Sequence, residues 1–435
     1  MTREQLVHQL HHGTEDEAIE ACELLGAMGD PKALGGLLHG LKSPSADVRG
    51  AACEALGLLG DARAVSPLVS MLRDDDEDVR AEAFSALFNI GQSRASTLKV
   101  EAFVGEDLAN PTAALTQVVW AADLEALQML HDGLEDEDPE VRIGSAYTLG
   151  RMGDISAFDT IAKLLSSDPD ADVRAAAAFA LGDLRAPKGL DALVQAWPHN
   201  QRPEDDEVAI LIIRAINELE DPRGQSALVQ GLSHRDPRTK QLACMGLGSQ
   251  RATEAIPYLL HVLNDAHEGV QRCAAEALGR IGHDSVIQPL IDGCGGRGAG
   301  VRQTIGRALK RLNVNFVIHA LGETLSRPET SVRQGAAYLM GQVGDGGNIR
   351  RAIKDPAWEV RKAAALGMGT IGDVTLRADL ELALGDEAWQ VRVAAAEGLK
   401  RLGDAAAIPA LRKRLGDDHP VVQNAVTIAL KGLES

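Results

Sequence analysis

The sequence predicts an all-α protein, an α-solenoid of stacked helical hairpins. A Val-Arg dipeptide recurs along the chain, and the copies at Val48 and Val79, and again at Val301 and Val332, are 31 residues apart. The residues after each dipeptide place apolar side chains three and four positions apart, which is the helical period. Only 3% of the chain is aromatic although 45% is hydrophobic, so Ala, Leu, Val and Gly must fill the core of closely packed helices.

About fourteen units of ~31 residues account for the whole chain and leave no room for a separate catalytic domain. The clear copies of the dipeptide begin at Val48, Val79, Val141, Val173, Val301, Val332, Val360 and Val391, and weaker units lie at Glu17, near Asn110 and at Val208, Thr239, Val270 and Val421. We therefore expect residues 1–435 to form a single continuous solenoid. The irregular segments 91–115 and 196–207 are candidate bends in it.

Each unit is expected to hold two short helices. The second helix starts near the Val and runs as in residues 48–61 and 360–373, where apolar residues keep the helical spacing. An N-cap Asp before a Pro should open this helix, and a Gly-Asp pair should end it. The Asp-Pro pairs start at Asp138, Asp168, Asp236 and Asp355, and the Gly-Asp pairs at Gly60, Gly153, Gly344, Gly372 and Gly403. The first helix of the next unit follows, often opened by a Pro as in AVSPLVSML and AIPYLLHVL.

The repeated pattern D-x-x-x-x-V-R-x-x-A-A-x-A-L-G-x-x-G-D resembles the short HEAT-like repeats of the phycobilisome-lyase (PBS lyase) type. The pattern is carried by Asp74 with Arg80, Asp168 with Arg174, Asp265 with Val270, Asp355 with Arg361 and Asp386 with Arg392. The resemblance covers essentially the full chain and implies a right-handed superhelix whose second helices line a concave face. The tetratricopeptide and ankyrin signatures are both absent.

The recurring Asp and Arg are interpreted as structural. If the units stack, one Arg per unit lies close to the Asp of a neighbouring turn, and the pairs form a ladder that satisfies helix ends. The acidic turns at 74–78, 135–138, 168–172 and 204–207 come at matching positions and should line one edge of the solenoid. They lack the spacing of an EF-hand loop, and acidic residues in a first helical turn complement the helix dipole.

Composition excludes several classes of protein. The formal net charge is −19, with 44 basic against 63 acidic residues, which opposes non-specific binding of nucleic acid. No run of apolar residues is long enough to span a membrane, and the first residues lack the apolar stretch of a signal peptide. The odd number of cysteines, 5, without paired spacing indicates a reduced, cytoplasmic chain.

No metal or cofactor is expected. His8 and His12 share a helix face near His11 and Glu4, but this terminal group lacks a fourth ligand. The His-Glu pairs with which the related deoxyhypusine hydroxylases hold two irons are missing at the matching positions. Cys22 and Cys53 occupy the same core-facing position of adjacent units and are interpreted as buried thiols.

A stripe of residues six positions past each Val marks the inferred concave face. The residues that we expect to contact a partner protein are Ile143, Tyr147, Phe179, Ile210, Arg214, Met245 and Tyr338. A contiguous exposed apolar surface with aromatic residues and an Arg is what a binding hot spot requires. The alternative is that these side chains pack between helices, since a shift of one residue in the register would turn them inward.

The glycine-rich turn 292–300 precedes the most basic part of this acidic chain. It lacks the strand and the Gly-Lys-Ser/Thr ending of a phosphate-binding loop, so it is interpreted as an ordinary, loose turn. The alternative is a patch that contacts an anion or an acidic partner. Its residues would be Arg297, Arg302, Arg307, Lys310 and Arg311.

The function that we expect is a non-catalytic protein–protein interaction scaffold or adaptor that holds one or more proteins in its groove. The resemblance implies an alternative, a bilin lyase or isomerase subunit that handles a tetrapyrrole on a phycobiliprotein, for which Cys244, Met245 and Arg214 are the candidate residues. A third interpretation, DNA-lesion recognition as in HEAT-like alkylpurine glycosylases, would need a basic concave face. We expect no nucleic acid and no membrane insertion, and self-association stays open.

Overall fold

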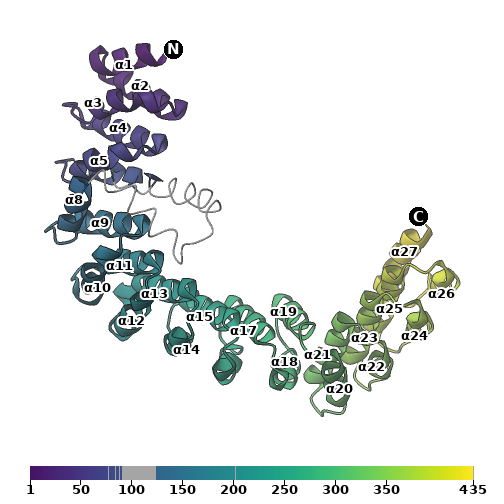
Figure 1. Ribbon diagram of the computed structural model, residues 1–435. Coiled ribbons are helices and arrows are strands. Elements are labelled where there is room, and N and C mark those ends of the chain that lie inside the picture. The colour runs from purple at the N-terminus through teal and green to yellow at the C-terminus, as the bar shows by residue number, and fades with distance from the viewer. Residues whose placement is uncertain (77, 84, 88, 91–123, 201, 435) are drawn as a thin grey trace, which may run out of the picture. The chain divides into compact units, whose positions relative to one another are not determined.

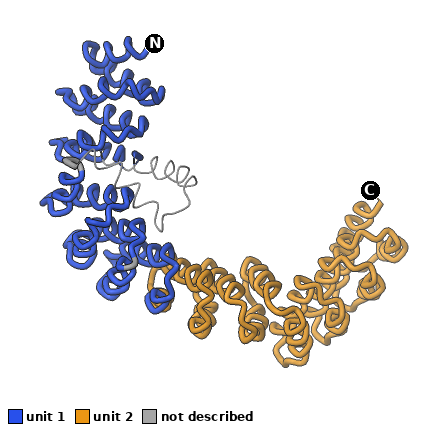
Figure 2. Tube along the Cα trace, viewed as in Figure 1, with its two compact units in different colours: residues 1–227 blue, residues 228–435 orange. Residues whose placement is uncertain are grey.

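The computed structural model describes the chain except for residues 77, 84, 88, 91–123, 201 and 435. Over these described residues the protein is helical and contains no strand, which confirms the all-α solenoid class. The chain forms two compact units, Met1–Ala227 and Leu228–Ser435 (Figure 2). The single continuous solenoid and its handedness stay predictions.

Unit 1 consists of helical hairpins whose second helices lie side by side (Figure 1). Its first helices are α1 (Arg3–His12), α3 (Leu34–Gly40), α5 (Val65–Met71), α8 (Leu124–Gly133), α10 (Phe158–Ser167) and α12 (Pro187–Ala196). Its second helices are α2 (Glu15–Met28), α4 (Ala46–Leu59), α9 (Pro139–Met152), α11 (Ala171–Leu184) and α13 (Asp206–Leu219). Helix α14 (Gln225–Gly231) spans the boundary between the units.

Unit 2 repeats the arrangement. Its first helices are α16 (Ile256–Val262), α18 (Ile287–Asp292), α20 (Val314–Thr324), α22 (Gly346–Ala352), α24 (Arg377–Ala383) and α26 (Ile408–Arg412). Its second helices are α15 (Pro237–Ser249), α17 (Glu268–Ile281), α19 (Ala299–Leu309), α21 (Thr330–Val343), α23 (Trp358–Ile371), α25 (Trp389–Leu402) and α27 (Pro420–Glu434).

The helix ends follow the predicted signals in part. The Gly of each predicted Gly-Asp pair ends its helix with a positive φ, as at Gly372 with 74°, and the Asp then caps a backbone N–H of the next turn. Asp138 and Asp236 are N-caps of α9 and α15, as predicted. The prediction is wrong for Asp168 and Asp355, because α11 and α23 begin three residues after these Asp residues.

Asp168 and Asp355 instead belong to the Arg–Asp ladder, which the structure confirms. Each ladder Arg or Lys reaches the carboxylate of the following turn, as Arg142 does with Asp168 at 2.9 Å from Nε to Oδ2. Arg142 also donates from Nη1 to two backbone carbonyls of its own turn. The pairs of this kind are Arg49–Asp74, Arg142–Asp168, Lys240–Asp265, Arg333–Asp355, Arg361–Asp386 and Arg392–Asp417. In each of these pairs the Asp carboxylate is largely buried beside the Arg or Lys that binds it.

The ladder also corrects the register of the last unit. Gln423 donates to the carbonyl oxygen of Asp417 six residues earlier, as Arg392 does to that of Asp386. The Val of this unit is therefore Val422, which is fully buried, and the prediction of Val421, which is exposed, is wrong. A Gln in place of the Arg hid the correct position in the sequence.

Adjacent second helices touch through their small residues. A Cβ added to Gly150 would lie 2.6 Å from the Cα of Ala180 in the next second helix, and one added to Gly369 would lie 2.6 Å from the Cα of Gly398. In each contact, the Gly of one A-L-G pattern lies against a small residue of the next second helix. That small residue stands two positions before the last position of the next A-L-G pattern, as Ala180 stands before Gly182. The two backbones can therefore approach closely. This is why so little aromatic side chain is needed to fill the core.

The two predicted irregular segments have different outcomes. Segment 91–115 and the unit near Asn110 lie outside the described residues. Segment 196–207 contains the short 3-10 turns Trp197–His199 and Pro203–Asp205. It supplies Asn200 and Asp205, which both bind the guanidinium of Arg174 in the place of a regular ladder Asp.

Candidate functional site

Three consecutive second helices of unit 1 bring aromatic and cationic side chains together. Tyr147 of α9 and Phe179 of α11 lie with their ring centres 4.8 Å apart and their planes tilted by 54°. The guanidinium carbon of Arg151 lies 4.9 Å from the centre of the Phe179 ring, and that of Arg214 of α13 lies 5.8 Å from it. We call Tyr147, Arg151, Phe179 and Arg214 the cation–aromatic cluster.

Both arginines of the cluster are held by carboxylates. Arg151 Nε lies 3.1 Å from Asp183 Oδ2, and Arg214 Nε lies 2.9 Å from Glu218 Oε1. Burial raises the pKa of the Asp183 carboxyl in spite of Arg151. Each cation beside the aromatic pair is therefore balanced by a carboxylate. The cluster has little net charge, and what it offers a partner is mainly the faces of its rings and guanidiniums.

The structure places the other predicted groove residues differently. Ile143 is half-buried on α9, whereas Ile210 is only 8% exposed and packs in the core of unit 1. The prediction that Ile210 is exposed is therefore wrong, because the apolar face of α13 is wider than the sequence spacing indicates. Met245 is 50% exposed on α15, and Tyr338 is half-buried on α21, so neither belongs to the cation–aromatic cluster. Sequence reasoning missed Arg151, although it lies one helical turn past Tyr147 on the same face.

The predicted basic patch in unit 2 is only partly exposed. The side chain of Arg297 is turned toward the protein, because its guanidinium donates to the carbonyl oxygens of Gly293 and Leu263 and to Asn264 Oδ1. Burial lowers the pKa of Arg297, which satisfies its own loop and carries no free binding surface.

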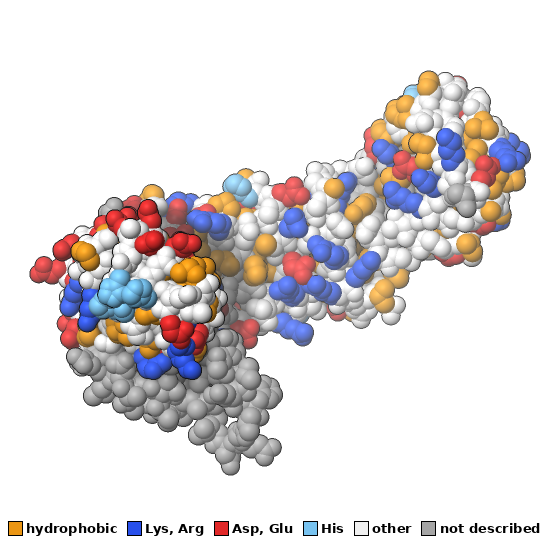
Figure 3. All heavy atoms as spheres, turned by 90° about the horizontal axis from the view of Figure 1, so that it is seen from above, with side chains coloured by type: hydrophobic (Ala, Val, Ile, Leu, Met, Phe, Trp, Pro, Cys, Tyr) orange, Lys and Arg blue, Asp and Glu red, His pale blue; other side chains and the backbone are white. Residues whose placement is uncertain are grey.

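The remaining basic side chains extend onto the preceding repeat. Arg311 Nη1 lies 2.7 Å from Glu276 Oε1 on α17, and Arg280 Nε lies 3.5 Å from the same oxygen. Arg307 and Lys310 are exposed on and just after α19. Figure 3 shows Lys and Arg side chains gathered on one stretch of unit 2 with few Asp or Glu among them.

Other candidate sites carry little chemistry. His11 lies 4.2 Å from His39 between ring centres, yet no group of three His, Cys, Asp or Glu side chains in the described part of the chain could hold a metal ion. Cys22 and Cys53 are fully buried, which confirms the prediction, and this burial raises the pKa of each thiol to about 12. Cys244 is fully buried and its pKa is raised by burial, so the bilin interpretation gains no support from it.

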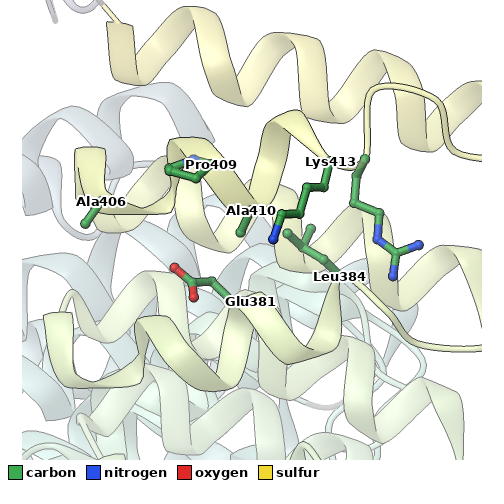
Figure 4. A pocket seen from close by; sticks show the side chains of 7 residues that line it. Glu381, Leu384, Ala406, Pro409, Ala410 and Lys413 are labelled. Atoms are coloured by element: carbon green, nitrogen blue, oxygen red, sulfur yellow. The ribbon is translucent and has the colours of Figure 1, made fainter.

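A shallow depression lies between α24 and α26 on the side of the first helices (Figure 4). It is lined by Glu381, Leu384, Ala406, Pro409, Ala410, Lys413 and Arg414. Four of its seven lining residues, Leu384, Ala406, Pro409 and Ala410, are apolar.

The fold and these surfaces define a class of protein, a helical-repeat solenoid. The model of the HEAT repeats family matches residues 3–87, 106–178, 158–232, 225–310 and 347–431, and the chain therefore belongs to the HEAT repeat family. The match to the finer phycobilisome-lyase type is not shown, and no catalytic family is identified. No curated protein matches the chain.

One solved structure shares the fold. It is that of Kap95p, whose binding induces the switch loops of RanGDP to adopt the GTP-bound conformation. It is 14% identical with a TM-score of 0.51, over 99% of this chain and 66% of that chain. An engineered protein is 21% identical with a TM-score of 0.34 over 100% of both chains. In the described residues, every helix is too short or too polar to cross a membrane.

Proposed function

We propose that the chain is a non-catalytic scaffold or adaptor that binds a partner protein along its second helices, with the cation–aromatic cluster of unit 1 as a contact surface. The position of Phe179 carries this proposal. Its ring is half-buried between Tyr147 and two guanidiniums, and neighbouring second helices supply all of these groups. Membership of the HEAT repeat family supports it, since such solenoids commonly mediate protein–protein interaction.

The cluster has the physical properties of a hot spot. Aromatic and Arg side chains dominate the energetics of protein interfaces. The ion pairs with Asp183 and Glu218 hold the two guanidiniums over Phe179 before a partner arrives, so less side-chain entropy is lost on binding. A partner that offers an apolar or aromatic side chain could stack on the exposed part of this surface.

The proposal includes one continuous scaffold from residue 1 to residue 435. It is supported by the family matches at 158–232 and 225–310, which run across the boundary between the two units without a break. A reduced, cytoplasmic setting also belongs to it and is supported by the five cysteines, all of which are free and four of which are buried.

An affinity pull-down from native lysate tests the proposal, with wild type beside Phe179→Ala/Arg214→Ala. A matched control is Phe316→Ala/Arg351→Ala, which removes a Phe and an Arg that are exposed on α20 and α22. We expect a partner protein that is lost only with the first variant, while both variants keep the helical circular-dichroism signal of the wild type. Identical partner sets would contradict the proposal, and a coloured eluate without a protein partner would favour a bilin ligand instead.

A further inference from the structure

Arg302, in the ladder position of α19, has no carboxylate partner among the described residues. Its side chain makes no hydrogen bond and no ion pair with the described residues, and its Nε is buried without a partner. Arg361 pairs with the Asp 25 residues further along, Asp386. The residue at the same distance from Arg302 is Arg327, so the position that holds the ladder Asp elsewhere holds an Arg here.

A neighbouring unit shows that the ladder can lose both members together. In α17 the ladder position is Gln271, and the residue 25 positions later is Gly296, so neither charge is present. Gln271 still bonds the carbonyl oxygen of its own turn, that of Asp265. Arg302 differs because the basic member of the pair is present while the position of the acid holds Arg327.

The backbone around Arg302 also departs from the other units. The turn that precedes α19 packs against α21, where a Cβ added to Gly335 would lie 2.9 Å from the backbone nitrogen of Gly295. Other ladder arginines donate to carbonyl oxygens of their own turn, as Arg142 does, and Arg302 makes no such bond. Its guanidinium carbon lies 5.2 Å from the centre of the Tyr338 ring instead.

Further basic side chains lie along and after α19. Arg307 and Lys310 are exposed on and after α19, and the exposed Arg327 lies in the following turn. Arg327 Nη2 is 3.6 Å from Asp292, a weak and exposed pair. We call Arg302 and Tyr338, which its guanidinium faces, the Arg302 site.

We propose that the Arg302 site binds an acidic segment of a partner protein, and that an Asp or Glu of this segment takes the place of the missing ladder carboxylate at Arg302. The inference rests on the proposed function, protein binding, and adds the chemistry of the partner. A guanidinium matches a carboxylate in a bidentate geometry, and the ladder pairs of this chain show that geometry at Arg333, Arg361 and Arg142. Nucleic acid is the less favoured occupant, because it carries a phosphate at every nucleotide and would need a longer basic surface than this chain of net charge −19 offers.

The test is fluorescence anisotropy at low salt with the full chain and a fluorescein-labelled peptide of alternating Asp and Gly, beside its Asn-Gly counterpart. We expect binding of the Asp peptide only, and an affinity about tenfold weaker with Arg302→Gln, since a charge-assisted contact is lost. Arg302→Gln removes no hydrogen bond, so its melting temperature should equal that of the wild type.

A second variant supplies the missing carboxylate from within the chain. Arg327→Asp keeps Arg302 but gives it a ladder partner, so the Asp peptide should bind about tenfold more weakly while the melting temperature is kept or raised. The matched control is Arg351→Asp, which makes the same change of charge at an exposed Arg of α22 in the same unit. The control should leave the affinity within about twofold of the wild type, since a distant surface charge acts only through screened repulsion.

The outcomes separate this inference from the proposed function. No binding of the Asp peptide, unchanged binding with Arg302→Gln, or an equal loss with Arg351→Asp would overturn it. Displacement of the peptide by duplex DNA at a lower concentration than by unlabelled Asp peptide would also overturn it and favour nucleic acid. Peptide binding together with unchanged lysate partners for Phe179→Ala/Arg214→Ala would instead overturn the contact surface in unit 1 alone.

Discussion

Arg361 joins two consecutive turns of the solenoid through Asp386. Its Nε and Nη2 lie 2.7 and 2.8 Å from the two carboxylate oxygens of Asp386, and its Nη1 donates to the carbonyl oxygens of Asp355 and Pro356, each at 2.9 Å. The two charged side chains are only 9% and 12% exposed. One guanidinium thereby satisfies the end of one turn and the carboxylate of the next, and the same relation recurs along both units.

The ladder should carry much of the stability that holds adjacent repeats together. Arg361→Ala leaves the carboxylate of Asp386 and two carbonyl oxygens without this donor, and we expect a loss of about 3 kcal/mol in the free energy of unfolding. Arg302→Ala should cost less than about 1 kcal/mol, because only the contact with Tyr338 is lost. Urea denaturation followed by circular dichroism measures both, and equal losses would show that the ladder pairs contribute nothing specific.

The ladder predicts acid sensitivity. A hydrogen bond from Arg49 lowers the pKa of the Asp74 carboxyl, and the pKa of Asp386 is also held below its ordinary value because the bonds from Arg361 and the Ala388 N–H outweigh its burial. A carboxyl whose pKa is lowered by folding stabilises the protein above its unfolded pKa, about 3.9, and loses this contribution as the pH falls through its folded pKa. The melting temperature should therefore be flat from about pH 8 to about pH 5 and fall steeply below about pH 4.

A variant that cannot titrate at one ladder position checks the cause. Asp386→Asn should melt below the wild type at neutral pH, and the difference between the two should shrink as the pH falls toward about 2. A constant difference across this range would contradict the assignment of the acid sensitivity to the ladder.

The small residues between second helices should tolerate no enlargement. Gly150→Ala places a methyl group 2.6 Å from the Cα of Ala180, and we expect a loss of about 1–3 kcal/mol, although Ala is the better helix former. Gly35→Ala in α3 is the matched control, since a Cβ there meets nothing within 4 Å, and it should raise stability by up to about 1 kcal/mol. Thermal or urea unfolding distinguishes the two, and a stabilising Gly150→Ala would show that the helices can move apart at little cost.

The thiols should resist modification in the native protein. Cys22, Cys53, Cys244 and Cys294 are buried and only Cys273 is partly exposed, with burial raising the pKa of its thiol as well. N-ethylmaleimide at neutral pH should label at most Cys273 in the native chain and all cysteines after denaturation, because the thiolate is the reactive form. Mass spectrometry of the tryptic peptides counts the labels. Rapid native labelling of Cys244 would reopen the bilin interpretation.

Local signals were sufficient for the repeat and for most helix ends. The Gly-Asp ends, the ladder and the buried Cys22 and Cys53 were all predictable, because each depends on residues within one period of ~31 positions. The N-cap predictions at Asp168 and Asp355 failed for a related reason. An Asp-Pro pair occurs at two different distances from the Val, and only the packed ladder shows which distance makes a cap.

The site was less predictable than the fold. Tyr147, Phe179 and Arg214 were placed on one face by counting, and the structure brings them together. Ile210 lies in the core, and Arg151 belongs to the cluster because its guanidinium contacts the Phe179 ring of the next repeat. Side-chain exposure depends on the packing of neighbouring repeats, which no single period contains.

The sequence by itself determined that this protein is an acidic, all-α chain of HEAT-like repeats with a recurring Arg–Asp pair, because helical period, caps and charge pattern are local and repeated. Only the tertiary structure decided which arginine lacks its acid, which glycines separate the helices, and which aromatic rings stay half-buried between guanidiniums. Each of these features joins residues about one repeat apart in the chain, and their distances are set by how closely the second helices pack.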